Sequence, residues 1–393
     1  MKEIIINVDK QKNKNIMLVE NGKLIEQYVE NKDTKRLEGN IYIGKVQNVL
    51  EGMQSAFIDI GEGKNTFIHL KDILPKVDSK VENIEEKVRI TNIKDVIKSE
   101  DNIIVQVKRD STNKKGARVS THINLTGRYV VLMPNATFVT VSQKIEEEQE
   151  RKRLIEIIKN NLIPTFGAII RTSAINKSEK EIKKDIDQLI KQWENVIEQD
   201  TTGDPKLVYQ SQGIIKRILI DLIDQDIEKI TLNDEEEYEN IKNILKQLDA
   251  NIEVKLNKED SLLGTYELDN QLEKVKNRKI WLKCGGFITI DKTEALTAID
   301  VNSGKFIGNK NLEETVFKVN QEASIEIAKQ IRLRDIGGII IIDYIDMHIK
   351  ENKEKVINIL KENLKKDRSK TQIVGFTELN LLEMTRKHMC SND

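Results

Sequence analysis

The chain has 393 residues, of which 38% are hydrophobic and 33% are charged, a composition typical of a globular protein with about two to four domains. A formal net charge of −1 excludes a uniformly basic coat for nucleic acid but leaves room for local basic patches. No apolar run approaches the roughly 20 residues that span a bilayer, and the apolar N-terminal stretch is too short for a signal peptide. We therefore expect no membrane segment and a cytoplasmic location.

The first 120 residues predict mainly β-structure. Residues 1–35 indicate strands over Glu3–Val8 and Asn15–Glu20 with Asn21-Gly22 as a hairpin turn, and they are expected to complete a domain formed later in the chain. Residues 36–120 contain short apolar segments separated by Gly-rich turns, which favours a small closed barrel. The strands expected there are Gly39–Val46, Met53–Ile60, Thr66–Leu70 and Asn102–Lys108, with residues 76–98 as an exposed excursion.

The remainder of the chain predicts mixed α/β structure. Residues 121–215 combine strands with charged amphipathic helices, and residues 216–278 add two helical segments and a strand at Asn251–Lys255. Strands and helices alternate in residues 279–379, which favours a layered sheet. The strands expected in these regions are Tyr129–Met133, Gly167–Thr172, Phe287–Asp291, Leu296–Val301, Ile339–Ile342 and Thr371–Phe376; the helices are Glu146–Asn161, Ser178–Ile197, Leu312–Leu333 and Glu354–Asp367.

Two aspartates stand at the ends of strongly apolar strands in the last of these regions. Asp300 follows Ala298-Ile299, and Asp343 follows four consecutive isoleucines. A carboxylate in such surroundings is costly unless a positive group pairs with it. Together with Asn302, the two carboxylates could bind Mg²⁺, which takes one or two carboxylates and keeps other positions for water and phosphate. The alternative is that each aspartate caps the turn after its strand; the role of Asp346 is left open.

Two further patterns point to nucleic acid. Phe57 and Phe67 lie on predicted barrel strands, where exposed aromatic rings stack on unpaired bases, and a basic stretch at residues 108–118 follows. Arg171 and Thr172 stand at a strand end, where an Arg and a hydroxyl can hold a terminal phosphate. The alternatives are core phenylalanines, a solvated charged loop and an ordinary salt bridge.

The cysteines and histidines carry no metal pattern. Cys284 and Cys390 are far apart and show no CxxC spacing, so neither a disulfide framework nor a zinc site is predicted. The four histidines show no ligand spacing either.

Several long motifs resemble those of the ribonuclease E/G family, and the similarity runs almost from end to end. The resembling segments are Glu294–Ser303, Arg332–Gly338 with Ile342–Met347, Gly39–Leu70, Leu125–Asn135 and Leu381–Arg386. The resemblance implies a split RNase H-like subdomain at residues 1–35 and 216–278, with an S1 (OB-fold) domain at 36–120 and a 5′-sensor domain at 121–215 inserted into it. A DNase I-like catalytic subdomain at 279–393 would follow.

The resemblance also implies roles for individual residues. The metal-binding carboxylates fall on Asp300 and Asp343 and the assisting amide on Asn302; the RNA-contacting residues are Phe57, Phe67 and Lys115; and the 5′-monophosphate pocket comprises Gly127, Val131, Arg171, Thr172 and Lys370. Well-known members have Arg in place of Lys370, and Lys keeps the charge without the bidentate fork, so weaker sensing is expected.

The implied activity is a magnesium-dependent endoribonuclease, with Mn²⁺ able to substitute, that cuts single-stranded, A/U-rich RNA to 5′-phosphate and 3′-hydroxyl ends in rRNA and tRNA processing and mRNA decay. The family's cysteine pair that shares zinc between subunits has no second cysteine after Cys390 here, so the zinc link is not supported and a homodimer is left open. The alternatives are a non-catalytic S1-type RNA-binding or ribosome-assembly factor and a metal-dependent DNA nuclease.

Overall fold

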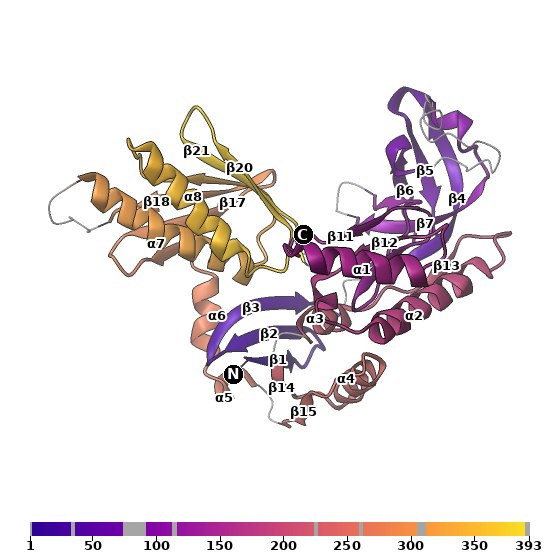
Figure 1. Ribbon diagram of the computed structural model, residues 1–393, viewed down its shortest axis with the longest axis horizontal. Helices are drawn as coiled ribbons and strands as arrows, with labels where there is room; N and C mark the ends of the chain where they lie inside the picture. Colours follow the sequence, from indigo (N-terminus) through magenta and orange to yellow (C-terminus); the bar gives the residue numbers. More distant parts are fainter. Residues whose placement is uncertain are drawn as a thin grey trace. The chain divides into compact units, whose positions relative to one another are not determined.

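The computed structural model describes residues 2–32, 36–73, 92–111, 116–223, 227–258, 262–304 and 312–389 (Figure 1). It divides into two compact units, Met1–Thr34 with Gln225–Asn392, and Lys35–Asp224. Lys115, Cys390 and most of the expected excursion at 76–98 lie outside the described residues. Within the described ranges, none of the helices has the length and apolar character needed to cross a membrane.

The first unit begins with a five-stranded sheet that joins distant parts of the chain. Its order is β15-β14-β1-β2-β3, and β1 pairs with β14 in parallel. Asn21 and Gly22 both have positive φ, as a two-residue type I′ hairpin requires, so the predicted turn is confirmed. The elements are β1 (Lys2–Val8), β2 (Lys14–Glu20), β3 (Lys23–Glu30), β14 (Ile227–Leu232) and β15 (Glu253–Leu256), with helices α4 (Glu235–Gln247), α5 (Leu262–Thr265) and α6 (Asp269–Val275).

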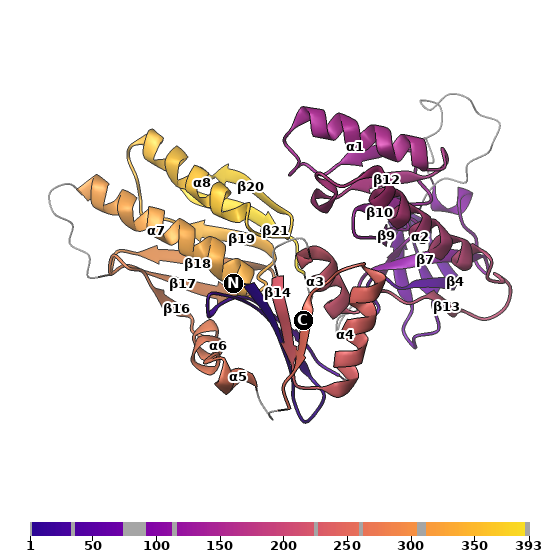
Figure 2. The same ribbon diagram turned by 60° about the horizontal axis from the view of Figure 1, so that its bottom comes forward.

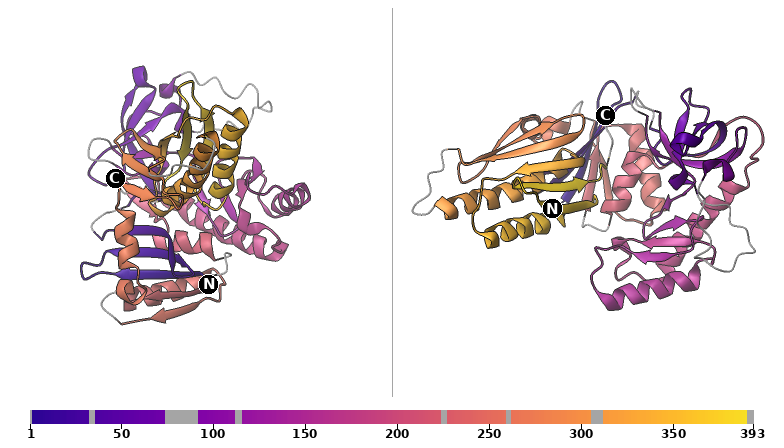
Figure 3. Two further views of the ribbon diagram at one scale, coloured as in Figure 1. Left: turned by 90° about the vertical axis from the view of Figure 1, so that its left-hand side faces the viewer. Right: turned by 90° about the horizontal axis from the view of Figure 1, so that it is seen from above.

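A six-stranded sheet follows in the same unit, with the order β16-β17-β18-β19-β21-β20. Two helices lie along one of its faces, so this part forms two layers (Figures 2 and 3). The elements are β16 (Lys279–Trp281), β17 (Phe287–Lys292), β18 (Leu296–Asn302), β19 (Gly338–Asp343), β20 (Thr371–Phe376) and β21 (Leu381–Arg386), with helices α7 (Leu312–Leu333) and α8 (Lys350–Leu364).

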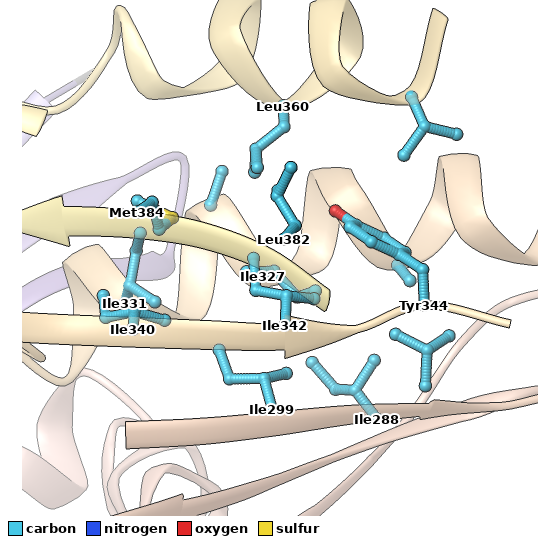
Figure 4. Packing of buried hydrophobic residues seen from close by; sticks show 14 of the residues in the cluster. Ile288, Ile299, Ile327, Ile331, Ile340, Ile342, Tyr344, Leu360, Leu382 and Met384 are labelled. Carbon is cyan, nitrogen blue, oxygen red and sulfur yellow. The ribbon is translucent and has the colours of Figure 1, made fainter. Parts of the chain in front are cut away.

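Period-two alternation decides which side chains of this sheet are buried. Ile299, Ile340, Ile342 and Leu382 point toward α7 and α8 and form the core with Leu360 and other helical residues (Figure 4). The residues between them point to the other face, where Ile339 is 50% exposed. This second face carries the candidate site.

Most elements predicted in this region are confirmed, but the prediction for α8 was wrong by about one turn. The helix begins at Lys350 rather than at Glu354, because Glu313 of α7 accepts the backbone N–H groups of His348 and Ile349 at 3.1 Å each. Both N–H groups precede the first turn of α8, and the Glu313 carboxylate supplies the acceptors that a helix start requires. The sequence prediction had placed these residues in a loop.

The second unit contains a closed barrel, as predicted. Strands β4, β5, β6, β8 and β7 follow one another, and a β4–β7 pairing closes the ring. Strand β13 pairs with the first residues of β4, and β5 pairs with the later ones. Isoleucine and valine side chains fill the interior. The strands are β4 (Ile41–Leu50), β5 (Ser55–Asp59), β6 (Thr66–His69), β7 (Asn102–Arg109), β8 (Arg118–Ser120) and β13 (Lys206–Tyr209), with short 3₁₀ turns at Glu51–Met53, Leu70–Asp72 and Ile93–Asp95.

A four-stranded sheet with three helices completes this unit, in the order β11-β12-β10-β9. The predicted helix from Ser178 is confirmed as α2, whose start is fixed by a capping box between Ser178 and Glu181. The elements are β9 (Leu125–Thr126), β10 (Val130–Met133), β11 (Val139–Val141), β12 (Gly167–Ile170), α1 (Glu148–Asn161), a 3₁₀ turn at Thr172–Ala174, α2 (Glu179–Ile197) and α3 (Ile214–Leu222).

Candidate active site

The two aspartates singled out from the sequence lie directly opposite each other. Strands β18 and β19 are parallel neighbours, and their register pairs Asp300 with Asp343. Both side chains are exposed on the face that α7 and α8 do not cover. Adjacent strands are about 4.8 Å apart, so the two carboxylates project side by side.

The electrostatics of this pair favour a cation. Partial burial raises the pKa of the Asp343 carboxyl, and the negative charges of Asp300 and Asp346 raise it further. Asn302 donates from Nδ2 to Asp300 Oδ2, which orients that carboxylate and leaves the amide oxygen of Asn302 available. In the described part of the chain, neither Asp300 nor Asp343 forms an ion pair with Lys or Arg.

The donor set fits a hard divalent cation. Asp300 and Asp343 would hold it, with Asn302 beside them. The described residues contain no group of three or more His, Cys, Asp or Glu side chains arranged for a metal. Two carboxylates suit Mg²⁺, which keeps several positions for water and substrate phosphate.

Helix α7 holds the chain segment that follows Asp343. Asn320 is fully buried; its Nδ2 donates to Ile345 O at 2.8 Å and its Oδ1 accepts from Ile345 N at 3.2 Å. Ser324 Oγ lies 2.8 Å from the hydroxyl of buried Tyr344. Sequence reasoning missed Asn320 and Ser324, although two polar residues within the apolar stripe of a long helix were a usable signal.

The barrel places its two phenylalanines together. Phe57 on β5 and Phe67 on β6 are cross-strand partners, and their ring centroids are 6.2 Å apart in a T-shaped arrangement. Both are partly exposed, while Ala56, Ile58 and Ile68 alternate with them and point into the barrel core. The rings therefore stand on the outer surface of the barrel.

The Arg171 side chain joins the loop before β10 to helix α3. It donates to the Gly127 carbonyl at 2.7 Å and forms an ion pair with Asp221. Thr172 begins the following 3₁₀ turn, and Val131 is half-buried on β10. Sequence reasoning missed Asp221, and no local pattern marked it.

Asp185 of α2 organises the same loop. Its carboxylate accepts backbone N–H groups of Arg128, Tyr129 and Val130 at 2.8–3.1 Å. Burial raises the pKa of Asp185, and the three N–H donors act in the opposite direction. A Cβ on Gly127 would lie 2.5 Å from both carboxylate oxygens, so this position requires glycine.

Lys370 is exposed immediately before β20 and belongs to the first unit, whereas Gly127, Val131, Arg171 and Thr172 belong to the second. The structure therefore brings four of the five expected pocket residues into one unit.

Paired carboxylates can hold a metal ion that acts on a phosphodiester, and exposed aromatic rings on a barrel can stack on bases, so both features suit a nuclease. Comparison with known proteins agrees. The sequence profile of the ribonuclease E/G family matches residues 124–389. The chain is 37% identical over 391 residues to ribonuclease G of Salmonella typhimurium (strain SL1344) and 38% identical over 389 residues to ribonuclease G of Haemophilus influenzae, covering 98% of this chain and 79% of each relative. It is also 35% identical over 394 residues to a putative ribonuclease E of Buchnera aphidicola subsp. Baizongia pistaciae, covering 98% and 95%. The chain belongs to the ribonuclease E/G family.

Proposed function

We propose that this chain is a magnesium-dependent endoribonuclease that hydrolyses single-stranded, A/U-rich RNA to 5′-phosphate and 3′-hydroxyl ends, in rRNA and tRNA processing and in mRNA decay. Membership of the ribonuclease E/G family makes it an endoribonuclease. The metal chemistry rests on one observation, the pairing of Asp300 with Asp343 on the exposed sheet face.

Asp300 and Asp343 would bind Mg²⁺, which, when bound, supplies Lewis-acid stabilisation of the phosphodiester and a water of lowered pKa. The protein residues hold this arrangement. Asn302 fixes the rotamer of Asp300, and Asn320 fixes the backbone two residues after Asp343. Mn²⁺ has the same preference for oxygen ligands and can substitute.

RNA binding is assigned to the barrel, which we propose to be an S1 domain. Phe57 and Phe67 present ring edges and faces on its outer surface, where unpaired bases can stack, and Lys115 would add a phosphate contact. We further propose that residues 1–35 and 216–278 form an RNase H-like subdomain, 121–215 a 5′-sensor domain and 279–393 a DNase I-like subdomain.

Recognition of a 5′-monophosphate is assigned to Gly127, Val131, Arg171, Thr172 and Lys370. The Arg171 guanidinium is the main candidate donor because it is charged and has five N–H groups, of which Gly127 O and Asp221 accept two. A phosphate would compete with Asp221 for this group. The 5′-monophosphate preference is therefore expected to be measurable but modest.

The test uses an unstructured A/U-rich oligonucleotide with a 5′-monophosphate. The unsubstituted chain should cleave it in Mg²⁺ or Mn²⁺, stop in EDTA and leave ends that carry 5′-phosphate and 3′-hydroxyl groups. Asp300→Asn and Asp343→Asn should each lower kcat at least about a thousandfold. This factor corresponds to the loss of several kcal/mol of transition-state stabilisation by the metal. RNA binding, measured by fluorescence anisotropy, should survive.

Asp291→Asn is the matched control. Asp291 is an acidic residue of the neighbouring strand β17 whose partner is the exposed Arg278, so its loss should leave cleavage near the starting level. Full activity of either site variant at saturating Mg²⁺ would contradict the metal assignment. Binding without any cleavage by the unsubstituted chain would point to a non-catalytic RNA-binding factor, and cleavage of the DNA counterpart would point to a DNA nuclease.

A further inference from the structure

A second group of side chains shares the exposed sheet face with Asp300 and Asp343. Lys279 and Trp281 stand on β16 and Phe287 on β17, and we call these three the aromatic hairpin. The Trp281 and Phe287 rings are 5.3 Å apart and T-shaped, and Trp281 is 59% exposed. Lys279 Nζ lies 4.1 Å from the centroid of Trp281 and 3.6 Å from that of Phe287.

Strand register places the aromatic hairpin beside the two aspartates. Lys279 pairs with Thr289, which pairs with Asp300, and Asp300 pairs with Asp343. The adjacent row on the same face runs from Trp281 to Phe287 to Asn302. Since strands are about 4.8 Å apart, Phe287 lies about 5 Å and Trp281 about 10 Å across the sheet from Asn302.

The turn of the hairpin is held firmly against the end of β18. A Cβ on Gly286 would lie 2.8 Å from the Asn302 carbonyl, so the turn can approach this closely only with glycine at that position. Glu322 of α7 accepts the Cys284 N–H at 2.8 Å and fixes the turn from the helix side. The backbone of the turn that carries Phe287 is therefore held close to Asn302.

We propose that the aromatic hairpin binds an unpaired base of the substrate RNA beside the scissile phosphate. This inference rests on the proposed metal-dependent cleavage and adds a binding position to it. A rigid, exposed indole stacks on any base, because every base has a π-face, and Lys279 adds a positive charge for the RNA backbone next to two carboxylates that repel it. The role of Trp281 is to position the substrate: it sets where the chain is cut and does not touch the reacting atoms.

The proposal can be tested with a series of RNAs in which one nucleotide at a time is replaced by an abasic site. In the unsubstituted chain, removing one particular base near the cleavage site should raise KM about tenfold, within the range for loss of one base–aromatic stack. Trp281→Ala should raise KM by a similar factor on intact RNA and should abolish the sensitivity to that abasic position. Trp281→Phe should retain most of it. A merely structural role of Trp281 would instead slow cleavage of all these substrates alike.

Fluorescence gives a direct readout without cleavage. The chain has two tryptophans, and Trp193 is only 7% exposed in the core of the other unit. In Trp193→Phe, Trp281 is the only indole, and RNA in EDTA should quench its emission, whereas an abasic strand of the same length should not. Equal quenching by both strands would contradict base stacking.

Ile339→Ala is the control on the same face. Ile339 is half exposed at the opposite end of the strands from Asp343, and its loss should leave KM and the abasic profile unchanged. If Trp281→Ala keeps its thermal stability but changes the oligomeric state in light scattering, the face is covered by a second copy and the proposal fails. If the unsubstituted chain does not cleave RNA in Mg²⁺, the proposed function itself fails; normal cleavage with an unaltered abasic profile in Trp281→Ala overturns only the aromatic hairpin.

Discussion

Charged side chains are paired differently on the exposed face around Asp300 and in the loop around Arg171. On the sheet face two carboxylates of the same sign stand side by side, and burial and the charge of Asp300 raise the pKa of Asp343. Around Arg171 each charge meets an opposite or hydrogen-bonding group, with Asp221 on the guanidinium and three N–H groups on Asp185. A bound cation, as proposed, would neutralise the first arrangement, whereas in the second the charges are paired within the protein. Removal of one charge should therefore change the free energy of unfolding in opposite directions in the two regions.

The largest effect on stability is expected where neutral hydrogen bonds hold the acidic face in place. Asn320→Ala removes both bonds to Ile345 and leaves two partly buried backbone groups without these partners, which costs about 3 kcal/mol in the free energy of unfolding. Because Asp343 then loses its fixed backbone, kcat should fall more than KM rises. Urea unfolding and steady-state kinetics measure both. Ser324→Ala, which loses the hydroxyl bonds to the Asn320 carbonyl and to the Tyr344 hydroxyl, should cost less, about 2 kcal/mol, and a cost as large as that of Asn320→Ala would contradict this account.

A single methyl group should disturb the satisfied loop strongly. Gly127→Ala places Cβ against the Asp185 carboxylate, which must move away from its three backbone donors, at a cost of about 2 kcal/mol. Asp185→Ala should cost a similar amount, and the double variant little more than either, because both changes remove the same contacts. Thermal unfolding of the two single variants and the double variant completes a double-mutant cycle. Simple additivity would show that Gly127 and Asp185 act independently.

The Arg171–Asp221 pair should show a smaller but specific coupling. Both side chains are about one-fifth exposed, so solvent screening limits the pair to about 1 kcal/mol in a double-mutant cycle of Arg171→Gln and Asp221→Asn. The two variants should have opposite effects on substrate choice. Asp221→Asn frees the guanidinium and should strengthen the preference for 5′-monophosphorylated over 5′-hydroxyl RNA, while Arg171→Gln should remove it. The ratio of kcat/KM values for the two RNAs is the measurement.

The smallest expected effect is a change in the stability of the metal-free protein, and its sign tests the role of Asp343. Asp343→Asn should stabilise the metal-free protein by a few tenths of a kcal/mol, because it removes like-charge repulsion at a screened surface site. Mg²⁺ should raise the Tm of the unsubstituted chain and leave that of Asp343→Asn nearly unchanged, since only the former binds the ion. Calorimetry with and without EDTA tests both statements. Destabilisation of the metal-free variant would show that Asp343 acts as an ordinary cap.

Sequence reasoning located the strand-end aspartates, the barrel and α7, because these depend on local patterns. Asp343 follows a run of four isoleucines and is the last residue of β19, whereas β18 continues two residues beyond Asp300 to Asn302. The barrel follows from short alternating strands, although its closing β4–β7 pair is a contact between distant segments. The candidate metal-binding positions were thus available before the structure was known.

The missed features depend on tertiary contacts. Strand β14 alternates poorly in Ile227–Leu232, and β16 is only three residues long with a lysine at its start, so neither gave a periodic signal. The start of α8 is set by Glu313, a residue of another helix. Asp185 and Asp221 act through partners far away in the sequence, and no local pattern distinguishes them from other helix residues.

The origin of the two aspartates on β18 and β19 has a consequence for synthesis of the protein. These strands are joined through the whole of α7, and their parallel pairing forms only after that crossover has packed. A nascent chain that ends before residue 343 therefore has Asp300 but not its cross-strand partner, so the pair of aspartates is among the last features of the fold to form.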